Sequence, residues 1–293
     1  FRPEKLNLAL IGPFKDKGIG ELFGVFDKKP CIVAGAGPSL ANSLDALKDT
    51  HGVPVISCLH NFHFFVDNEL RCDYFVTLDA GEIVLEEISE GGAHPEEYYW
   101  EKTKDHTLLA FIGSPPKLIE KWKGKVLFFH CPIPNYEILE EMQKIEQFHT
   151  YVSTGGNVLG ACAYIAKAIC GANPLAFIGA DFCFSYKKKF HPWASKYDKT
   201  LGHVMRGFDV YGHKVATWQS YYNFKLWFDW LSCSVPGIYI NCTEGGMMGA
   251  YPEGNIQQIQ QMELKRLIRM YSMYEEMRDG CEKPEIPNNK ILF

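Results

Sequence analysis

The most constraining feature of this sequence is a series of seven short apolar runs in which hydrophobic residues follow one another without alternation. The runs begin at Cys31, Val53, Tyr74, Leu108, Val126, Leu175 and Ile238. A strand that is covered on one face alternates apolar and polar residues, whereas a strand buried on both faces is continuously apolar. Helix-like stretches separate the runs. The pattern therefore predicts an α/β fold with a doubly wound, mostly parallel sheet of about seven strands.

The length and composition fit a single large domain. The chain has 293 residues, 46% of them hydrophobic, which is enough to bury a full core. We expect a lead-in at residues 1–28, one α/β domain at 29–254 and a C-terminal helical tail at 255–293, with a long helix starting at Asn255. Between residues 185 and 216 the pattern becomes irregular, which predicts a lid-like insertion.

The net charge and the positions of the cysteines argue against several classes of protein. A net charge of −5 and a pI near 6.1 give no reason to expect nucleic-acid binding. No apolar window is long enough to span a bilayer and no signal-like segment occurs, so the expectation is a cytoplasmic protein without a transmembrane segment. The ten cysteines are scattered singly, which predicts buried free thiols and no metal site. The sequence is compatible with an oligomer.

The segment CIVAGAGPSL, residues 31–40, predicts a strand, a tight turn and a helix N-terminus. Gly35 and Gly37 permit the turn and a close backbone approach, and Pro38 suits the first helical position. Exposed N–H groups at such a turn favour a phosphate. A plain strand-to-helix corner explains the same residues, so the segment alone does not decide between the two.

Small or polar residues follow all seven predicted strands. In an open parallel sheet, ligands bind outside the carboxyl ends of the strands, so these positions form the candidate site. A turn or capping role explains any one of them, but their repetition at one edge favours a binding site. In chain order they are Gly35 and Gly37; His60 and Asn61; Asp79; Gly113 and Ser114; His130; Gly179 and Asp181; and Asn241, Thr243 and Glu244.

Two common nucleotide motifs are absent. The dinucleotide fingerprint requires a third glycine where this chain has Leu40, and an acidic residue where the second strand ends in His60 and Asn61. A Walker-type phosphate loop requires a lysine followed by serine or threonine after the turn, and none follows. The sequence therefore favours a nucleotide or sugar-nucleotide site of another kind.

Two later segments resemble the turn at residues 31–40, because they also contain glycines beside groups that can bind a phosphate. Ser153 to Gly156, STGG, directly precedes a helix rich in small residues that we expect from about Asn157 to Cys170, with Ser153 or Thr154 as its cap. The segment NCTEGG, residues 241–246, again combines a strand end, polar groups and two glycines. Hydroxyls and N–H groups at these positions suit a phosphate-bearing ligand.

Four segments carry a resemblance to a known family. They are AGAGPSL at 34–40, CDYFVTLDA at 72–80, the stretch from STGG to GADFCF at 153–184, and NCTEGG. On these residues the chain resembles the motility accessory factor (Maf) glycosyltransferases, whose domain family also contains the archaeal 6-hydroxymethylpterin pyrophosphokinases. It is more distantly similar to bacterial sialyltransferases that use CMP-sialic acid, in which a segment like VISCLHNF at 55–62 ends in a nucleotide-contacting asparagine.

The resemblance implies a Rossmann-like domain that binds a nucleotide. It implies a catalytic base at His191, with His203 and His213 as competitors, and Tyr186 or Tyr197 beside the leaving phosphate. A loop histidine next to a proline is the plain alternative for His191. The nucleotide-binding residues that we expect are Gly35, Gly37, Pro38, Ser39, Asn61, Asp79, Ser153, Thr154, Gly155, Gly156, Gly179, Asp181, Thr243 and Glu244.

Three functions follow as hypotheses. The first is a glycosyltransferase that moves a sialic-acid-like nonulosonate from a CMP donor to a glycan or protein hydroxyl and needs no cofactor. The second is an ATP-dependent 6-hydroxymethylpterin pyrophosphokinase, which would need Mg²⁺ held by carboxylates such as Asp79, Asp181 and Glu244. The third is a non-catalytic nucleotide-binding module with the same fold.

Overall fold

The computed structural model describes residues 18–131, 151–184, 204–250 and 258–280. Its centre is an eight-stranded sheet in the order β10-β9-β6-β1-β2-β3-β4-β5, in which every neighbouring pair is parallel. The prediction of a doubly wound parallel sheet is confirmed. The strands are β1 (Cys31–Ala34), β2 (Val55–Cys58), β3 (Tyr74–Thr77), β4 (Thr107–Phe111), β5 (Lys125–Phe129), β6 (Leu175–Ile178), β9 (Tyr239–Asn241) and β10 (Ile259–Gln261).

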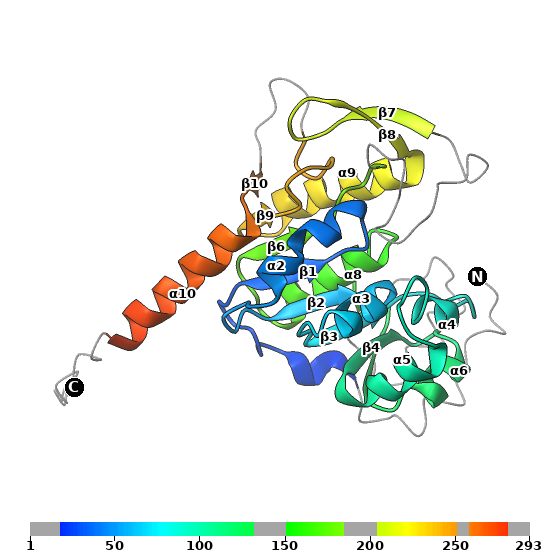
Figure 1. Ribbon diagram of the computed structural model, residues 1–293. Coiled ribbons are helices and arrows are strands. Elements are labelled where there is room, and N and C mark those ends of the chain that lie inside the picture. Colours follow the sequence, from blue (N-terminus) through cyan, green and yellow to red (C-terminus); the bar gives the residue numbers. More distant parts are fainter. Residues whose placement is uncertain (1–17, 132–150, 185–203, 251–257, 281–293) are drawn as a thin grey trace, which may run out of the picture.

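Helices cover both faces of this sheet (Figure 1). Because crossovers between parallel strands are right-handed as a rule, the path from β1 towards β5 puts its helices on one face, and the reversed path from β5 through β6 to β9 puts its helices on the other. The first group is α2 (Leu44–Leu47), α3 (Phe62–Asp67), α4 (Val84–Glu87), α5 (Glu96–Lys102) and α6 (Pro116–Lys121). The helices of the reversed path are α8 (Val158–Tyr164), continued by a π-helical turn, η7 (Ile165–Ile169), and α9 (Gln219–Ser234), and the last helix is α10 (Leu264–Gly280).

Short 3₁₀ segments complete the fold. They are η3 (Ile19–Leu22), η4 (Pro38–Ser43), η5 (Leu59–Asn61) and η6 (Thr103–Asp105). The helix that Pro38 opens is therefore 3₁₀ before it becomes α2. In the described part of the lead-in, Ile19 and Leu22 are buried in the main core.

The core explains the continuous apolar runs. All four residues of β1, β2 and β6 are buried, because α8 packs on β1, β2 and β3 on one face while the helices of the first group cover the other. Small residues on α8, including Gly160 and Ala161, permit this close approach. A Cβ on Gly160 would overlap the carbonyl oxygen of Thr154.

The edge of the sheet and the predicted insertion differ from the sequence-based expectation. The structure has an eighth strand, β10, within the stretch from Asn255 that we expected to be helical, and helix α10 starts only at Leu264. The three residues of β10 have no apolar run to reveal them, because they pair only with β9 at the sheet edge. The described end of the insertion is an antiparallel hairpin, β7 (Val204–Phe208) and β8 (Lys214–Trp218), rather than an irregular segment.

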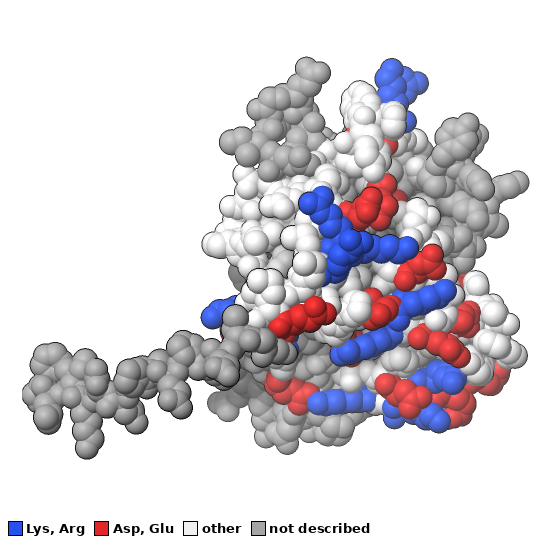
Figure 2. Space-filling model, turned by 60° about the vertical axis from the view of Figure 1, so that its left-hand side comes forward, with Lys and Arg blue, Asp and Glu red and all other residues white. Residues whose placement is uncertain are grey.

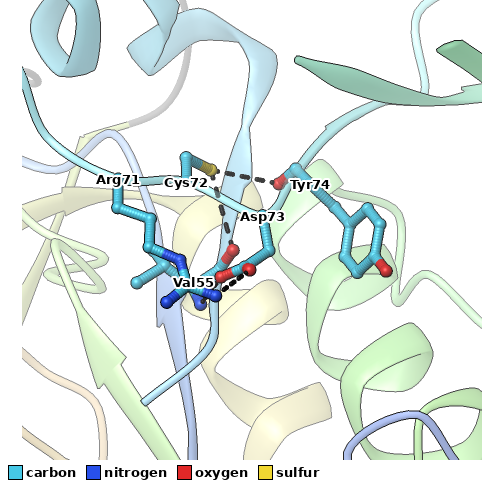
Figure 3. Close-up of polar contacts among 5 residues, drawn as sticks. All are labelled: Val55, Arg71, Cys72, Asp73 and Tyr74. Atoms are coloured by element: carbon cyan, nitrogen blue, oxygen red, sulfur yellow. Dashed lines mark hydrogen bonds and ion pairs between the residues drawn. The ribbon is translucent and has the colours of Figure 1, made fainter. Parts of the chain in front are cut away.

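A polar cluster fixes the amino ends of β2 and β3 (Figure 3). The carboxylate of Asp73 accepts hydrogen bonds from the backbone N–H of Val55 (2.8 Å) and from the guanidinium of Arg71 (2.6 Å). The thiol of Cys72 lies 3.3 Å from the carbonyl oxygen of Tyr74. Because this cluster lies at the opposite edge from the carboxyl ends, it stabilises the register of the strands without taking part in a site there.

The charged surface is mixed. On the face in Figure 2, lysine and arginine side chains are interspersed with aspartate and glutamate. Exposed ion pairs such as Lys121 with Glu96, at 3.2 Å, contribute little to stability because water screens them. No helix in the described part of the chain combines the length and the apolarity that a bilayer crossing requires.

Candidate functional site

The candidate site lies where the direction of the sheet reverses. Strands β1 and β6 are neighbours, but the chain continues from β1 to β2 on one side and from β6 to β9 on the other. This divergence opens a crevice at the carboxyl ends of the two strands, which is the usual ligand position in open α/β sheets. The turns after β1 and β6 line this crevice. They are joined by hydrogen bonds from the N–H of Gly35 to the oxygen of Ile178 and from the N–H of Gly37 to the oxygen of Gly179, both 2.8 Å.

Glycines make this contact between the two turns possible. A Cβ on Gly35 would lie 2.5 Å from the carbonyl oxygen of Gly179, and one on Gly37 would overlap the carboxylate of Asp181. Gly179 itself has φ +58° and faces the oxygen of Gly35. The sequence predicts that these glycines allow a ligand to approach. The structure shows that they first allow the two turns to pack against each other.

A cavity of about 260 Å³ opens at this edge. The turns after β1, β2, β3 and β6 contribute to its wall, together with residues from α4, α8 and α9. Its lining residues are Gly35, Ala36, Gly37, Pro38, Cys58, Leu59, His60, Val76, Thr77, Asp79, Glu87, Asn157, Val158, Leu159, Gly179, Asp181, Phe182, Cys183, Tyr221 and Phe224.

Asp181 is the most buried carboxyl group in this wall. It is 8% exposed, and its Oδ2 accepts hydrogen bonds from the hydroxyl (2.8 Å) and the backbone N–H (3.2 Å) of Ser39. Burial raises the pKa of Asp181 to about 6, although the hydrogen bonds from Ser39 act in the opposite direction. Asp181 thus connects the two turns and presents a carboxyl group that titrates close to neutrality.

Several titratable residues lie on the side of the cavity that β2 and β3 form. Burial raises the pKa of Asp79, and burial together with the charges of Asp79 and Glu90 raises the pKa of Glu87 to about 7. Nε2 of His60 lies 2.9 Å from Oε2 of Glu90. Burial lowers the pKa of His60 in spite of this carboxylate, so the imidazole is largely neutral at pH 7. The wall can therefore both donate and accept protons near neutral pH.

One buried hydroxyl in the wall has no hydrogen-bond partner among the described residues. Thr77, at the end of β3, is 1% exposed, and its Oγ1 is unpaired. A buried polar atom without a partner is costly, and because Thr77 lines the cavity, a ligand bound there is a candidate partner for its hydroxyl. Oδ1 of Asn61 is likewise unpaired, although Asn61 is not among the lining residues.

A family match and a structural likeness bear on this geometry. The model of the family described as 6-hydroxymethylpterin diphosphokinase MptE-like matches residues 8–187. The chain belongs to the MptE-like family. Among curated protein sequences, none matches this chain.

In structure, the chain is similar to a Maf glycosyltransferase from Magnetospirillum magneticum AMB-1, with a TM-score of 0.58 and 13% sequence identity. The likeness covers 94% of this chain and 43% of that protein, so this chain spans less than half of its length. At this identity the likeness establishes the shared fold. Together with the MptE-like match, it confirms the resemblance to the Maf and MptE-like domain family, while the more distant similarity to sialyltransferases stays a prediction.

The residues that the MptE-like family model matches form only part of the cavity wall. The match contains the turns after β1, β2, β3 and β6, and with them all the acidic lining residues. The aromatic wall lies beyond it, because Tyr221 and Phe224 come from α9. The carboxyl-rich side of the site is thus within the family match, while the aromatic side is outside the matched residues.

Six of the predicted nucleotide-binding residues line the cavity, and a seventh is bonded to one of them. The lining residues are Gly35, Gly37, Pro38, Asp79, Gly179 and Asp181. Ser39 is bonded to Asp181. Asn61 is buried behind the turn after β1, where its Nδ2 donates to the oxygen of Gly35 at 3.1 Å. The predicted catalytic residues His191 and Tyr186 lie outside the described residues, as do Tyr197 and His203.

The STGG segment, Ser153 to Gly156, is not in the lining of the cavity, and packing explains its glycines. Gly155 has φ +58° and a Cβ there would overlap the ring of Trp227, while Gly156 has φ +83° and lies next to Phe224. The cap of α8 is Asn157, whose Oδ1 accepts from the N–H of Gly160 at 2.8 Å. The expectation that Ser153 or Thr154 caps the helix is wrong, because the two glycines place the helix start after them.

The NCTEGG segment also supports the site from behind. Thr243 is buried, and its Oγ1 accepts from the N–H of Ala180 at 3.2 Å, which holds the turn after β6. Glu244 is exposed and outside the lining. No group of three side chains that could hold a metal ion occurs among the described residues. Asp79, Asp181 and Glu244, the carboxylates that the second hypothesis assigns to Mg²⁺, do not form such a group.

Several lining residues are missing from the list of predicted nucleotide-binding residues. His60 was recognisable as a residue that follows a strand. Glu87 belongs to a short helix with several acidic residues and has no distinguishing signal. Tyr221 and Phe224 lie in an aromatic stretch whose sequence indicates only a helix, and their place in the wall depends on how α9 packs on β6, where Phe228 meets Phe177.

Replacement of Glu87 by glutamine should change the pH dependence of stability. A folded-state pKa of about 7 against an ordinary value of 4.5 means that the folded protein loses stability as pH rises from about 4.5 to 7. Glu87→Gln removes this loss, so the variant should be more stable than the wild type above pH 7 by about 1 to 2 kcal/mol, reduced by the water that reaches the carboxyl. Urea unfolding at several pH values measures the difference.

The exposed neighbour Glu86 provides the control for this experiment. Glu86→Gln should leave the pH profile of stability unchanged. Superimposable profiles for the wild type and Glu87→Gln would show that the carboxyl of Glu87 is not buried against Asp79 and Glu90 as the structure has it.

Proposed function

We propose that this protein is a nucleotide-sugar-dependent glycosyltransferase that transfers a sialic-acid-like nonulosonate from a CMP donor to a hydroxyl of a glycan or protein. The fold shared with a Maf glycosyltransferase supports this proposal. The proposal also retains one catalytic domain at residues 29–254 that carries the insertion at 185–216.

The carboxyl-rich wall of the cavity is the observation that carries the proposal. Asp79, Glu87 and Asp181 all line it. Departure of a nucleotide from the anomeric carbon leaves positive charge on the sugar, and the ionised carboxyl groups of this wall stabilise such charge as it develops. With pKa values of about 6 and about 7, Asp181 is mostly ionised at pH 7 and Glu87 is ionised in part. Diphosphate transfer instead concentrates negative charge, which carboxylates alone would oppose. The charge of this wall therefore favours glycosyl transfer.

His60 can supply the proton transfer that the reaction needs. The acceptor hydroxyl forms a bond to the anomeric carbon while the bond from that carbon to the phosphate oxygen breaks, and CMP leaves with the electron pair. The acceptor proton passes to the neutral imidazole of His60, and the carboxylate of Glu90, 2.9 Å from Nε2, stabilises the resulting imidazolium. His191 remains the base that the family resemblance predicts, with Tyr186 at the leaving phosphate.

The aromatic residues and Thr77 in the wall of the cavity can contact the base or the sugar of the donor. Tyr221 and Phe224 present aromatic surface to the cavity, on which a pyrimidine or sugar ring can stack. The unpaired hydroxyl of Thr77 offers a buried hydrogen-bonding group. Gly37, Pro38 and Ser39 stay the predicted neighbours of the phosphate or ribose.

Calorimetric titration with CMP and with ATP tests the proposal. We expect CMP to bind without added metal and Thr77→Val to weaken the binding about fivefold, because one hydrogen bond contributes about 1 kcal/mol. Thr77→Val should not reduce stability, since it removes an unpaired polar atom.

Ser114→Ala is the matched control, because Ser114 also has a buried hydroxyl that is unpaired among the described residues, but it is not in the lining of the cavity. Its affinity for CMP should equal that of the wild type. Binding of ATP with no response to CMP would overturn the proposal in favour of the pyrophosphokinase. The description of the matching family favours that second candidate. Absence of any nucleotide binding would contradict both.

A further inference from the structure

Helix α10 carries an exposed apolar stripe. Its inner face is buried through Leu264, Leu267 and Ile268, but the helix then continues away from the body of the molecule (Figure 1). Beyond that point the exposed fractions of four side chains are 54%, 54%, 61% and 70%, for Met270, Met273, Tyr274 and Met277 in that order. Their spacing of three, four and seven residues places them on one face of the helix. A continuous stripe of this kind indicates a contact surface.

The order of basic and acidic residues along α10 is unfavourable for the dipole of the helix. The first half carries Lys265, Arg266 and Arg269, and the first turn has no acidic residue, while Glu275 and Glu276 lie in the second half. A helix on its own is stabilised by the opposite order, with acidic residues near its start and basic residues near its end. An antiparallel neighbour with the same sequence would place basic residues beside acidic ones and would also oppose the two dipoles favourably.

A groove runs beside the stripe. It has a volume of about 260 Å³, and its walls include Pro174, Ile240 and Leu267 together with Met270 and Tyr274 of α10. Because Met270 and Tyr274 belong to both the groove and the stripe, a helix that packs on the stripe also covers the groove. The surface therefore offers both protruding methionine side chains and an apolar hollow next to them.

We propose that α10 pairs with α10 of a second copy of this chain in an antiparallel, twofold-symmetric dimer. A twofold interface brings the same patch of both copies together, so the patch must complement itself. The order of charges on α10 meets this condition. With Arg269 of one copy beside Glu276 of the other, the twofold axis passes close to Met273, and the four stripe residues of both copies lie at the centre of the interface.

Sedimentation velocity of the full chain tests the dimer. We expect the wild type to have twice the 33.3 kDa mass of the chain at micromolar concentrations. The double variant Met273→Glu with Met277→Glu should be monomeric with unchanged circular dichroism, because both positions are exposed. Phe23→Glu is the control, because Phe23 is also exposed, at 61%, but lies directly after η3, far from α10 in the sequence. The Phe23→Glu variant should remain dimeric.

A charge swap tests the antiparallel register. Arg269→Glu should weaken dimerisation about tenfold, because it places like charges together at two symmetric positions. Adding Glu276→Arg should restore the wild-type affinity, which pairing in any other register would not do. A monomeric wild type, or a dimer that survives Met273→Glu with Met277→Glu, would overturn the proposal, and so would a failure of the second charge change to restore affinity. None of these outcomes depends on the proposed enzymatic function.

Discussion

Replacement of Gly179 by alanine should lower the free energy of unfolding by about 3 kcal/mol. Two effects add at this position. Gly179 has φ +58°, which an alanine adopts only with strain, and its Cβ would overlap the carbonyl oxygen of Gly35. The turns after β1 and β6 would have to separate, which breaks the hydrogen bond from Gly37 to Gly179. Urea unfolding measures the loss of stability, and CMP titration should show weaker binding because both turns line the cavity.

A variant at Gly24 separates the effect of backbone strain from the effect of steric overlap. Gly24 has φ +71°, but no atom of the described residues lies within 4 Å of a Cβ built on it. Gly24→Ala should therefore cost only the backbone strain, about 1 kcal/mol. Equal losses in the two variants would mean that the turns after β1 and β6 are not in the tight contact that the structure shows.

His60→Ala should reduce the turnover of a CMP-nonulosonate donor about a hundredfold or more, the usual contribution of general-base catalysis. Affinity for CMP should change much less, because the role of His60 is to accept the acceptor proton. The pH profile of turnover should also lose its acidic limb. That limb should lie below the ordinary pKa of histidine in the wild type, since burial lowers the pKa of His60.

Two further histidine variants complete this experiment. His51 is a solvent-exposed residue that pairs with Asp49, and His51→Ala should leave turnover unchanged. His191→Ala tests the base that the family resemblance implies. A large loss with His191→Ala and none with His60→Ala would assign the proton transfer to His191 and contradict the role of His60.

Much of the fold was predictable because both faces of the sheet are buried. The apolar runs that begin at Cys31, Val53, Tyr74 and Leu175 each form a central strand. The errors lie where burial is one-sided. Strand β10 at the sheet edge and the hairpin of β7 and β8 have too few buried residues to leave a continuous apolar run.

The candidate site was predictable only on one side. Glycines and carboxylates that directly follow strands, such as Gly37, Asp79 and Asp181, must lie at the carboxyl edge in any parallel sheet. The STGG segment has the same composition, yet the structure leaves Gly155 under Trp227 and outside the lining of the cavity. Composition does not distinguish a glycine that admits a ligand from one that admits a neighbouring ring.

The sequence by itself determined the class of fold, the strands of the central sheet other than β10, and the family, because these depend on local patterns and motifs. Tertiary structure alone decided that β1 adjoins β6, that Glu87 and the aromatic residues of α9 complete the cavity, and that the pKa of Asp181 rises to about 6. The physical reason is that desolvation and side-chain contact depend on distance in space, and residues such as Ser39 and Asp181 meet across 142 positions of the chain.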